Sequence, residues 1–276
     1  MNSHTSSEGR FAVSPLRISS GLAITVSILV WLAMLGPLAA LLGHLSPSKI
    51  VSTLAPPGAL NPLFISLEAS ALALFVLVAT GTPLAWLLAR QRLPAGRVWE
   101  TGVLIPLLMP PLVIGLLLIY MVGPATPLGR LLADIHLTAS NTFFALVLAE
   151  IYESAPYYIL GAEAAFAKVD RRLEENAALL GDRWPRTVWR ITLPLAAPGL
   201  ATSLTTAWAR AMGAFGAVII IAYHPYGLPM KTWVNLEEIG LSGALPYALC
   251  LIVAALPLPI LAYLWSSRTQ QGRLVS

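Results

Sequence analysis

Charge is the scarcest property of this chain. Of its 276 residues only 11% are Asp, Glu, Lys or Arg, whereas 57% are hydrophobic and the mean hydropathy is +0.75. A soluble globular domain carries about 25% charged residues. This composition therefore indicates an integral membrane protein. The length allows a bundle of several spans, but not such a bundle together with a large soluble catalytic domain.

Cysteine and the residue patterns of catalytic centres are also scarce. The single cysteine, Cys250, excludes an intramolecular disulfide and a redox pair. The chain contains no phosphate-binding loop, no HExxH helix, no CxxC pair and no nucleophile elbow. Its four histidines are scattered, so they do not predict a metal site. We expect no catalytic residue, metal or cofactor on this chain, and any energy source must be a separate protein or an ion gradient.

Long apolar runs dominate what is present, and they predict an all-α bundle of about six transmembrane helices. Prolines inside these runs predict kinks, because neighbouring helices can satisfy the carbonyls that proline leaves free. The run around Pro110 and Pro111 is the least regular. The predicted spans are Gly21–Leu42, Phe64–Ala89, Gly102–Val122, Thr142–Ala164, Leu195–Ala222 and Ala244–Trp265.

The basic residues fall mainly on one side of these spans. With the amino terminus inside, thirteen of the 17 Lys and Arg residues lie on inner segments, three lie on outer segments and Arg210 lies within a span. This bias predicts cytoplasmic termini. It also accounts for the net charge of +4 without nucleic acid as a partner. The inner residues are Arg10, Arg17, Arg90, Arg92, Arg97, Lys168, Arg171, Arg172, Arg183, Arg186, Arg190, Arg268 and Arg273, and the outer ones are Lys49, Arg130 and Lys231.

Two domain boundaries follow from the same pattern. Residues 1–20 are polar and predict a cytoplasmic tail, and residues 21–276 predict a transmembrane domain with its core at 64–265. The first apolar run is too long for the core of a signal peptide, so we interpret it as a retained span. The segment 223–245, with its turn residues, predicts an outer loop.

A polar segment at about 166–194 interrupts the apolar runs and carries six basic residues. Asp170 is suited to capping a helix whose inner face would be Leu173, Ala177 and Leu180, and Gly181 is suited to the left-handed position that ends it. Asp182 is suited to capping a second short helix. The pattern predicts two short amphipathic helices in the cytoplasm, on which the small Ala177 and Ala178 let a partner approach closely.

This segment resembles the EAA loop of ATP-binding-cassette (ABC) importer permeases. The pattern is Glu-Ala-Ala, a glycine six residues after the glutamate, and Ile-x-Leu-Pro ten residues later. The matching positions here are Glu175, Ala177, Gly181, Ile191, Leu193 and Pro194, and Asn176 departs from the first alanine. The resemblance implies that Glu175, Ala177, Ala178, Gly181, Ile191, Leu193 and Pro194 couple the chain to an ATPase.

The resemblance also implies a set of partners and a location. These are a cytoplasmic ABC ATPase dimer that holds ATP and magnesium, a second permease chain, identical or homologous, and an extracytoplasmic solute-binding protein. The membrane would be the cytoplasmic (inner) membrane of a bacterium or archaeon, and the fold that of a type I importer permease.

Further segments resemble the molybdate, tungstate and sulfate permeases of this family. They are Gly81–Trp86, Pro110–Gly115 and Trp208–Ala217. Ala214 stands where that branch often has a glutamate, and thiamine, ferric-iron and phosphonate permeases share parts of the pattern. An alternative of a different class is a secondary transporter or channel, but the chain shows no matching halves of the kind such carriers have.

Arg210 is the most distinctive residue within a span, because a guanidinium there must face a cavity or a charged partner. One hypothesis places it on the translocation pathway, where it would meet an oxyanion, together with Gly213, Phe215, Pro110 and Pro111. The alternatives are an ion pair within the bundle, with Glu150, Glu153 or another helix, and snorkelling of the side chain toward the cytosol.

Overall fold

A computed structural model describes residues 20–264 of the chain. The chain divides into two compact units, residues 1–46 and 47–276. The predicted inner charges Arg10, Arg17, Arg268 and Arg273 and the final residue of the sixth predicted span, Trp265, lie outside the described residues.

The described residues are predominantly helical and contain no strand, which agrees with the predicted all-α architecture. The helices are α1 (Ser20–His44), α2 (Pro47–Leu54), α3 (Asn61–Ala89), α4 (Gly96–Leu108), α5 (Pro111–Val122), α6 (Pro127–Asp134), α7 (Phe143–Ala167), α8 (Arg171–Leu179), α9 (Trp184–Thr187), the π-helix η1 (Val188–Thr192), α10 (Leu193–Met212), α11 (Val218–Ile221), α12 (Leu228–Glu238) and α13 (Leu241–Ala255).

The described part of the first unit consists of α1. This helix is 25 residues long and apolar on all sides, and it is long enough to cross a bilayer. Two of its hydroxyls form hydrogen bonds within the helix: Thr25 and Ser27 donate to the carbonyls of Gly21 and Ala23 one turn earlier. A helix of this kind is stable in lipid without a polar partner.

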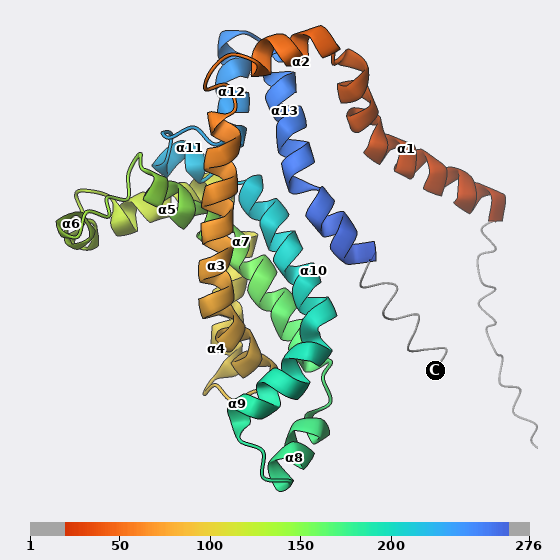
Figure 1. Cartoon of the computed structure of the whole chain (residues 1–276), viewed down its shortest axis with the longest axis vertical. Coiled ribbons are helices and arrows are strands. Elements are labelled where there is room, and N and C mark those ends of the chain that lie inside the picture. The colour runs from red at the N-terminus through yellow and green to blue at the C-terminus, as the bar shows by residue number, and fades with distance from the viewer. Residues whose placement is uncertain (1–19, 265–276) are drawn as a thin grey trace, which may run out of the picture. The chain divides into compact units, whose positions relative to one another are not determined.

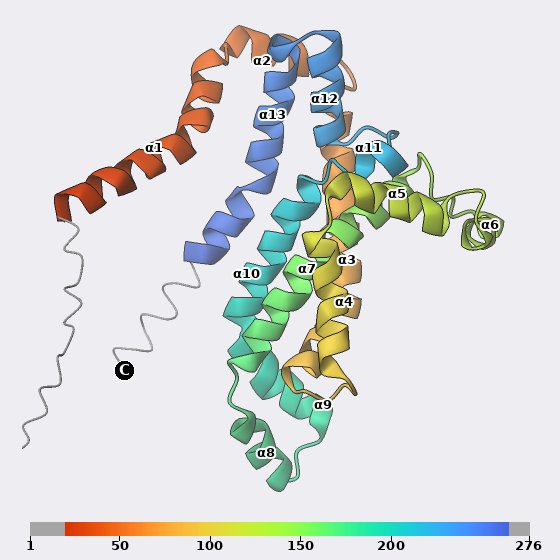
Figure 2. The ribbon, with the colours of Figure 1, turned by 180° about the vertical axis from the view of Figure 1, so that it is seen from behind.

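The core of the second unit forms around α7. Figures 1 and 2 show α3, α7 and α10 running side by side, and α7 has its most extensive contacts with the other two. More than half of the apolar window of α7 is buried, against a third for α3 and about a tenth for α13. Small residues let α7 and α10 approach: Gly161 faces Ser203, and Gly199 faces Ala165.

Proline determines where many of the helices begin. Its fixed φ suits the first turn of a helix, and its missing N–H costs nothing there. Seven helices of the second unit have proline at one of the first two positions, namely Pro47, Pro62, Pro111, Pro127, Pro185, Pro194 and Pro229.

The predicted third span, Gly102–Val122, is not a continuous helix. Helix α4 ends at Leu108, α5 starts at Pro111, and the two are bent by 115°. Met109 and Pro110 are both extended, because each precedes a proline and the proline ring excludes the helical region for the residue before it. The two consecutive prolines therefore break the span, whereas a single proline would only kink it.

The predicted fifth span, Leu195–Ala222, is also too long. Helix α10 ends at Met212, and residues 213–217 separate it from the short α11. Glycines at 213 and 216 favour this break, and Gly216 is also needed for packing, since a side chain there would collide with Pro111 at the start of α5. The two broken spans therefore meet at their breaks.

The segment 223–245 is not the open loop that its turn residues suggest. After the turn at Pro225 the chain forms α12, whose Leu228, Met230 and Val234 are buried and which packs against α13. The sequence pattern hides this helix because Pro229 signals a turn equally well as a helix start.

Four described helices are long and apolar enough to cross a membrane, or five if the bent pair α4–α5 counts as one span. They are α1, α3, α7 and the segment Leu241–Leu264 that begins with α13. Helix α10 has the length, but Thr202, Ser203, Thr206 and Arg210 make it more polar than the others. The helical part of the fifth predicted span is therefore a polar helix packed against the core.

Positive charge gathers at one end of the second unit. Nine predicted inner cations lie in the α3–α4 turn and in the segment from Lys168 to Arg190, which Figure 1 places together at the α8 end. Lys49 and Lys231 lie on α2 and α12 at the opposite end.

The close packing of α7 on α10 predicts sensitivity to added volume. Gly199→Leu should lower the thermal unfolding temperature of the detergent-solubilised protein, because its side chain would overlap Ala165, and overpacking of a core costs about 1–3 kcal/mol. Gly102→Leu is the matched control, since no atom lies within 4 Å of a side chain placed there. Equal unfolding temperatures for the two variants would contradict this packing.

Candidate functional site

The cytoplasmic segment predicted from the sequence forms a compact element at one end of the second unit. Asp170 caps α8 as predicted, its carboxylate accepting from the N–H of Arg172. Gly181 has a φ of +85°, the left-handed conformation that glycine adopts readily. The N–H of Gly181 donates to the carbonyl of Ala178, and the N–H of Asp182 donates to that of Ala177. These two hydrogen bonds form a Schellman cap. The helix therefore ends sharply at the predicted glycine.

Two local predictions for this element are wrong. Asp182 does not cap α9; Arg183 occupies that position, and the Asp182 carboxylate pairs with Arg186 one turn later. The predicted inner face of α8 is reduced to Ala177, because Leu180 is 88% exposed and Leu173 is 42% exposed. Residue spacing shows which positions share a face, but not how far a short helix settles onto its neighbours.

The tip of the element exposes a large apolar surface, formed by Leu179, Leu180, Trp184 and Trp189. These side chains are 56% to 88% exposed, although they lie among six basic residues at the polar end of the unit. Exposed apolar patches within polar surroundings mark interaction sites. We call this set the tip surface.

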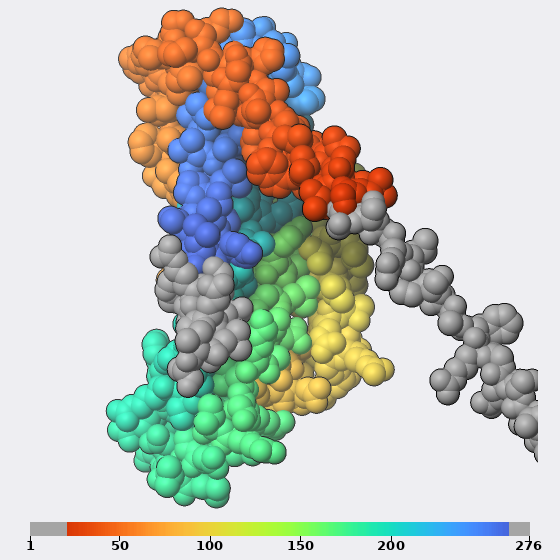
Figure 3. All heavy atoms as spheres, turned by 90° about the vertical axis from the view of Figure 1, so that its right-hand side faces the viewer, coloured from red at the N-terminus to blue at the C-terminus, as the bar shows by residue number. Residues whose placement is uncertain are grey.

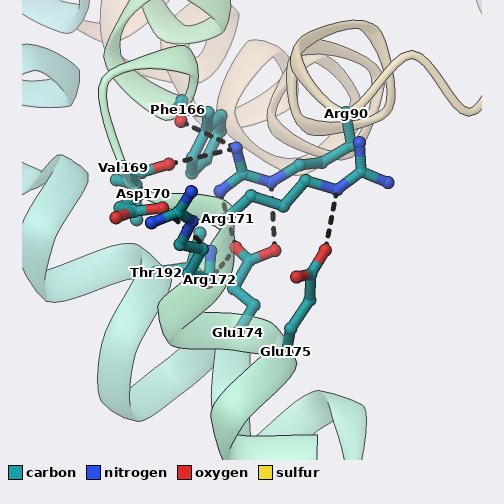
Figure 4. Close-up of polar contacts among 9 residues, drawn as sticks. All are labelled: Arg90, Phe166, Val169, Asp170, Arg171, Arg172, Glu174, Glu175 and Thr192. Carbon is teal, nitrogen blue, oxygen red and sulfur yellow. Dashed lines mark hydrogen bonds and ion pairs between the residues drawn. The ribbon is translucent and has the colours of Figure 1, made fainter.

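Beneath the tip surface, a buried arginine ties α8 to the transmembrane helices. Arg90, at the end of α3, is 5% exposed. Its guanidinium donates twice to the Glu174 carboxylate, with Nη2–Oε1 at 2.7 Å and Nε–Oε2 at 3.0 Å, as Figure 4 shows. This bidentate fork is the geometry in which arginine binds a carboxylate most strongly.

The same two side chains reach two further spans. Arg90 Nη1 donates to the carbonyls of Phe166 and Val169 at the end of α7 (Figure 4), at 3.2 and 3.4 Å. Thr192, immediately before α10, donates its hydroxyl to Glu174 Oε1 at 2.6 Å. We call Arg90, Glu174 and Thr192 the anchor. It connects α8 to α3, α7 and α10 at once.

The electrostatics of the anchor keep Glu174 ionised. Burial by itself would raise the pKa of the Glu174 carboxyl. Hydrogen bonds from Arg90 and Thr192 and the positive charges of Arg90 and Arg92 outweigh burial, so the pKa lies below its usual value. The ion pair is therefore intact at neutral pH.

The predicted coupling residues surround the anchor but do not form it. Glu175 is mostly exposed and pairs loosely with Arg171 at 3.6 Å (Figure 4). Ala177 is buried and Ala178 exposed, while Ile191 lies half-buried in η1 and Leu193 and Pro194 begin α10. Sequence reasoning missed Glu174, although it directly precedes Glu175, and treated Arg90 only as a marker of topology.

The predicted pathway residues gather at the two broken spans. Arg210 Nη2 lies 2.6 Å from Glu153 Oε2, so the structure contains the ion pair that was one alternative to a pathway role. Glu153 Oε1 also accepts from the N–H of Ala217 at 3.0 Å. Arg210 and α11 are thus held by one buried carboxylate across the break that contains Gly213.

The remaining members of the predicted set lie nearby. Pro110 and Pro111 form the break between α4 and α5, and Pro111 packs against Gly216. Phe215 lies in the α10–α11 break, with its ring 5.6 Å from that of Trp233. A second buried carboxylate, Glu150, accepts from Ser70 Oγ of α3 at 2.9 Å. Whether solute touches these residues stays a prediction.

No group of three metal-ligating side chains occurs within residues 20–264.

A helical bundle with broken spans, a polar element at one end and an exposed tip surface defines a subunit of a membrane transporter. The chain belongs to the family described as "Binding-protein-dependent transport system inner membrane component", which matches residues 81–271. It is therefore an inner-membrane component, as the sequence resemblance predicted.

Curated relatives agree with this family. A probable molybdenum ABC transporter permease protein of Haloferax volcanii is 37% identical over 84% of this chain and 85% of its own length. The molybdenum transport system permease protein ModB of Mycobacterium tuberculosis is 32% identical over 82% of this chain and 86% of its own. A probable sulfate transport system permease protein of Chlorokybus atmophyticus is 27% identical over 80% and 79%.

Solved structures confirm the predicted importer permease fold. A bacterial ABC transporter that imports the acidic polysaccharide alginate aligns with a TM-score of 0.66 and 18% identity, covering 89% of this chain and 94% of the other. The inward-facing MetNI methionine ABC transporter aligns with a TM-score of 0.58 and 16% identity, covering 83% and 99%. At these identities the likeness concerns the fold alone.

The anchor predicts a difference between two adjacent glutamates. Glu174→Gln should lower the thermal unfolding temperature at pH 7, because hydrogen bonds to charged groups contribute about 1.5–3 kcal/mol and Arg90 would remain buried without its counter-ion. Glu175→Gln, at the exposed neighbour, should have little effect.

The stabilisation that Glu174 provides should also depend on pH. Because the folded pKa of Glu174 is lowered, its stabilisation is complete above the unfolded pKa of about 4.3 and is lost as pH falls through the folded pKa. The unfolding temperatures of the wild type and Glu174→Gln should therefore converge in acid. A constant gap between them down to acid pH would show that the ion pair is not responsible.

Proposed function

We propose that this chain is the permease subunit of an ABC importer that carries a tetrahedral oxyanion, namely molybdate, tungstate or sulfate, across the inner membrane. The observation that carries the proposal is the combination of an exposed apolar tip surface with a buried anchor beneath it. The first suits a partner protein, and the second suits the transmission of force from that partner into the spans.

The tip surface fits a cytoplasmic ABC ATPase. Leu179, Leu180, Trp184 and Trp189 provide the apolar centre of an interface, and six basic residues provide its polar rim. The ATPase would hold the ATP and magnesium, since this chain lacks the phosphate-binding loop. One such element per chain implies two permease chains, identical or homologous, for an ATPase dimer.

The anchor would convert movement of the ATPases into movement of the bundle. A buried ion pair in bidentate geometry resists extension, and here it joins α8 to the ends of α3, α7 and α10. When ATP binding draws the two ATPases together, α8 would therefore move with three spans as one body. The breaks at residues 109–110 and 213–217 provide places where the outer parts of the bundle can respond differently.

The orientation follows from charge. The nine cations at the α8 end support a cytoplasmic location for that end, because basic residues are retained on that side. The end with α2 and α12 then faces outward, where a solute-binding protein would deliver the oxyanion. Support for the solute class comes from the relatives described as molybdenum and sulfate permeases.

Transport by the reconstituted complex tests this proposal. Proteoliposomes with the permease, its ATPase and its binding protein should accumulate molybdate only when ATP is supplied. Uptake driven by an ion gradient without ATP would favour a secondary transporter, and no uptake of molybdate, tungstate or sulfate would reject the oxyanion assignment.

The tip surface makes a separate prediction. Leu179→Asp combined with Leu180→Asp should abolish co-purification of the ATPase while leaving the permease folded, because both side chains are more than 85% exposed. Ile239→Asp, a similar change at an exposed position on the opposite end, should retain the ATPase. Retention of the ATPase by the double variant would show that it docks elsewhere.

A further inference from the structure

A groove with a volume of about 780 Å³ lies between α7 and α10, beside the helices that the anchor joins. Figure 3 shows α7 reaching the molecular surface between α13 and α4. The α7 wall includes Tyr157, Gly161 and Lys168, and the α10 wall includes Pro198, Thr202 and Thr206. Gly161 and Gly199, where the two helices contact each other most closely, form part of its lining.

The lining of the groove differs from the surfaces that suit lipid. Large apolar side chains are exposed on α3 and α13, for example Phe75 and Val253. The groove instead presents hydroxyls from both helices and a lysine. Polar side chains inside a membrane protein face water or protein in preference to lipid, because lipid cannot hydrogen-bond to them.

The hydroxyls on α10 form a regular series. Thr202, Thr206 and Arg210 follow one another at intervals of four residues and so share one face of the helix. Thr202 Oγ1 donates to the carbonyl of Pro198 at 3.0 Å, and Thr206 Oγ1 donates to that of Thr202 at 2.8 Å. Both threonine hydroxyls are therefore bonded within α10, yet rotation about one bond lets each of them donate to a passing acceptor.

Both ends of this series are positively charged. Lys168 lines the groove at its α8 end. At the other end, Arg210 lies over the ring of Tyr157, with Cζ 5.9 Å from the ring centre. The one carboxylate in the lining, Asp170, is already used to cap α8. Because Arg210 is paired with Glu153, Lys168 is the cation that the groove itself offers to an anion.

We infer that the groove is the inner half of the solute path, in which Thr202 and Thr206 bind a tetrahedral oxyanion on its way toward Lys168. The inference rests on the proposed function and adds the residues that carry the solute. Each hydroxyl gives up only a local bond to its own helix, so it binds an oxyanion weakly. Conduction requires such sites, because a solute must enter and leave each one.

Thiol accessibility tests the location of the path independently of the solute. In a Cys250→Ser background, which removes the single native cysteine, Thr206→Cys should react several-fold faster with a charged methanethiosulfonate reagent than Thr205→Cys. Thr205 is the matched control, since its hydroxyl also bonds within α10 but it does not line the groove. An anionic reagent should react faster than a cationic one at Thr206→Cys, and Lys168→Gln should reduce that preference.

Transport tests the role of the hydroxyls. Thr202→Val combined with Thr206→Val keeps the side-chain shape but removes both hydroxyls, so ATP-driven molybdate uptake should fall several-fold. ATPase stimulation by the binding protein should persist, because the anchor and tip surface are untouched. Thr205→Val should transport normally.

The outcomes separate this inference from the proposed function. If the wild-type complex imports molybdate and the double valine variant imports it at the same rate, the groove is not the path. The same conclusion follows if Thr206→Cys is unreactive or if it cross-links to a second permease chain. If the wild-type complex imports no oxyanion, the proposed function fails, and slow labelling of Thr206→Cys would then overturn the path on its own.

Discussion

The buried ion pair between Arg90 and Glu174 is the interaction on which the rest of this structure depends. A guanidinium with 5% exposure is costly unless each of its donors has a partner, and here the carboxylate and two backbone carbonyls supply them. Because the partners come from α7 and α8, satisfying one charge brings together segments that lie some 80 residues apart in the chain. A change that weakens the pair therefore alters both stability and the connection between the cytoplasmic element and the spans.

The bundle combines a stiff part with a divided part. Helix α7 is continuous and packs closely with α3 and α10 through small residues, so this trio can move as one body. The α4–α5 and α10–α11 spans are both broken, and their broken parts pack against each other through Gly216 and Pro111. The Glu153 carboxylate spans the second break by binding Arg210 and the Ala217 N–H. This division places the stiff part next to the tip surface and the breaks farther along the bundle.

Local patterns predicted the parts of the site that depend on short-range geometry. Asp170 caps α8 because its side chain reaches an N–H two residues away, and Gly181 ends the helix because its backbone accepts a positive φ. Asp182 shows the limit of such reasoning, since its carboxylate could either cap α9 or pair with Arg186, and in the structure it forms the pair. Likewise the tandem prolines predicted an irregular span, but not a bend of 115°.

The amino-acid sequence by itself determined the class of this protein: a membrane bundle with a basic cytoplasmic element of the importer permease family. Hydropathy, charge bias and motif spacing are properties of the linear chain, and the bilayer imposes its constraints on that chain segment by segment. Only the tertiary structure decided that Glu174, and not its neighbour Glu175, holds Arg90, that Arg210 pairs with Glu153, and that Thr202 and Thr206 line a groove. These facts depend on how helices rotate and pack against one another, and a rotation of one residue along a helix exchanges a buried side chain for an exposed one.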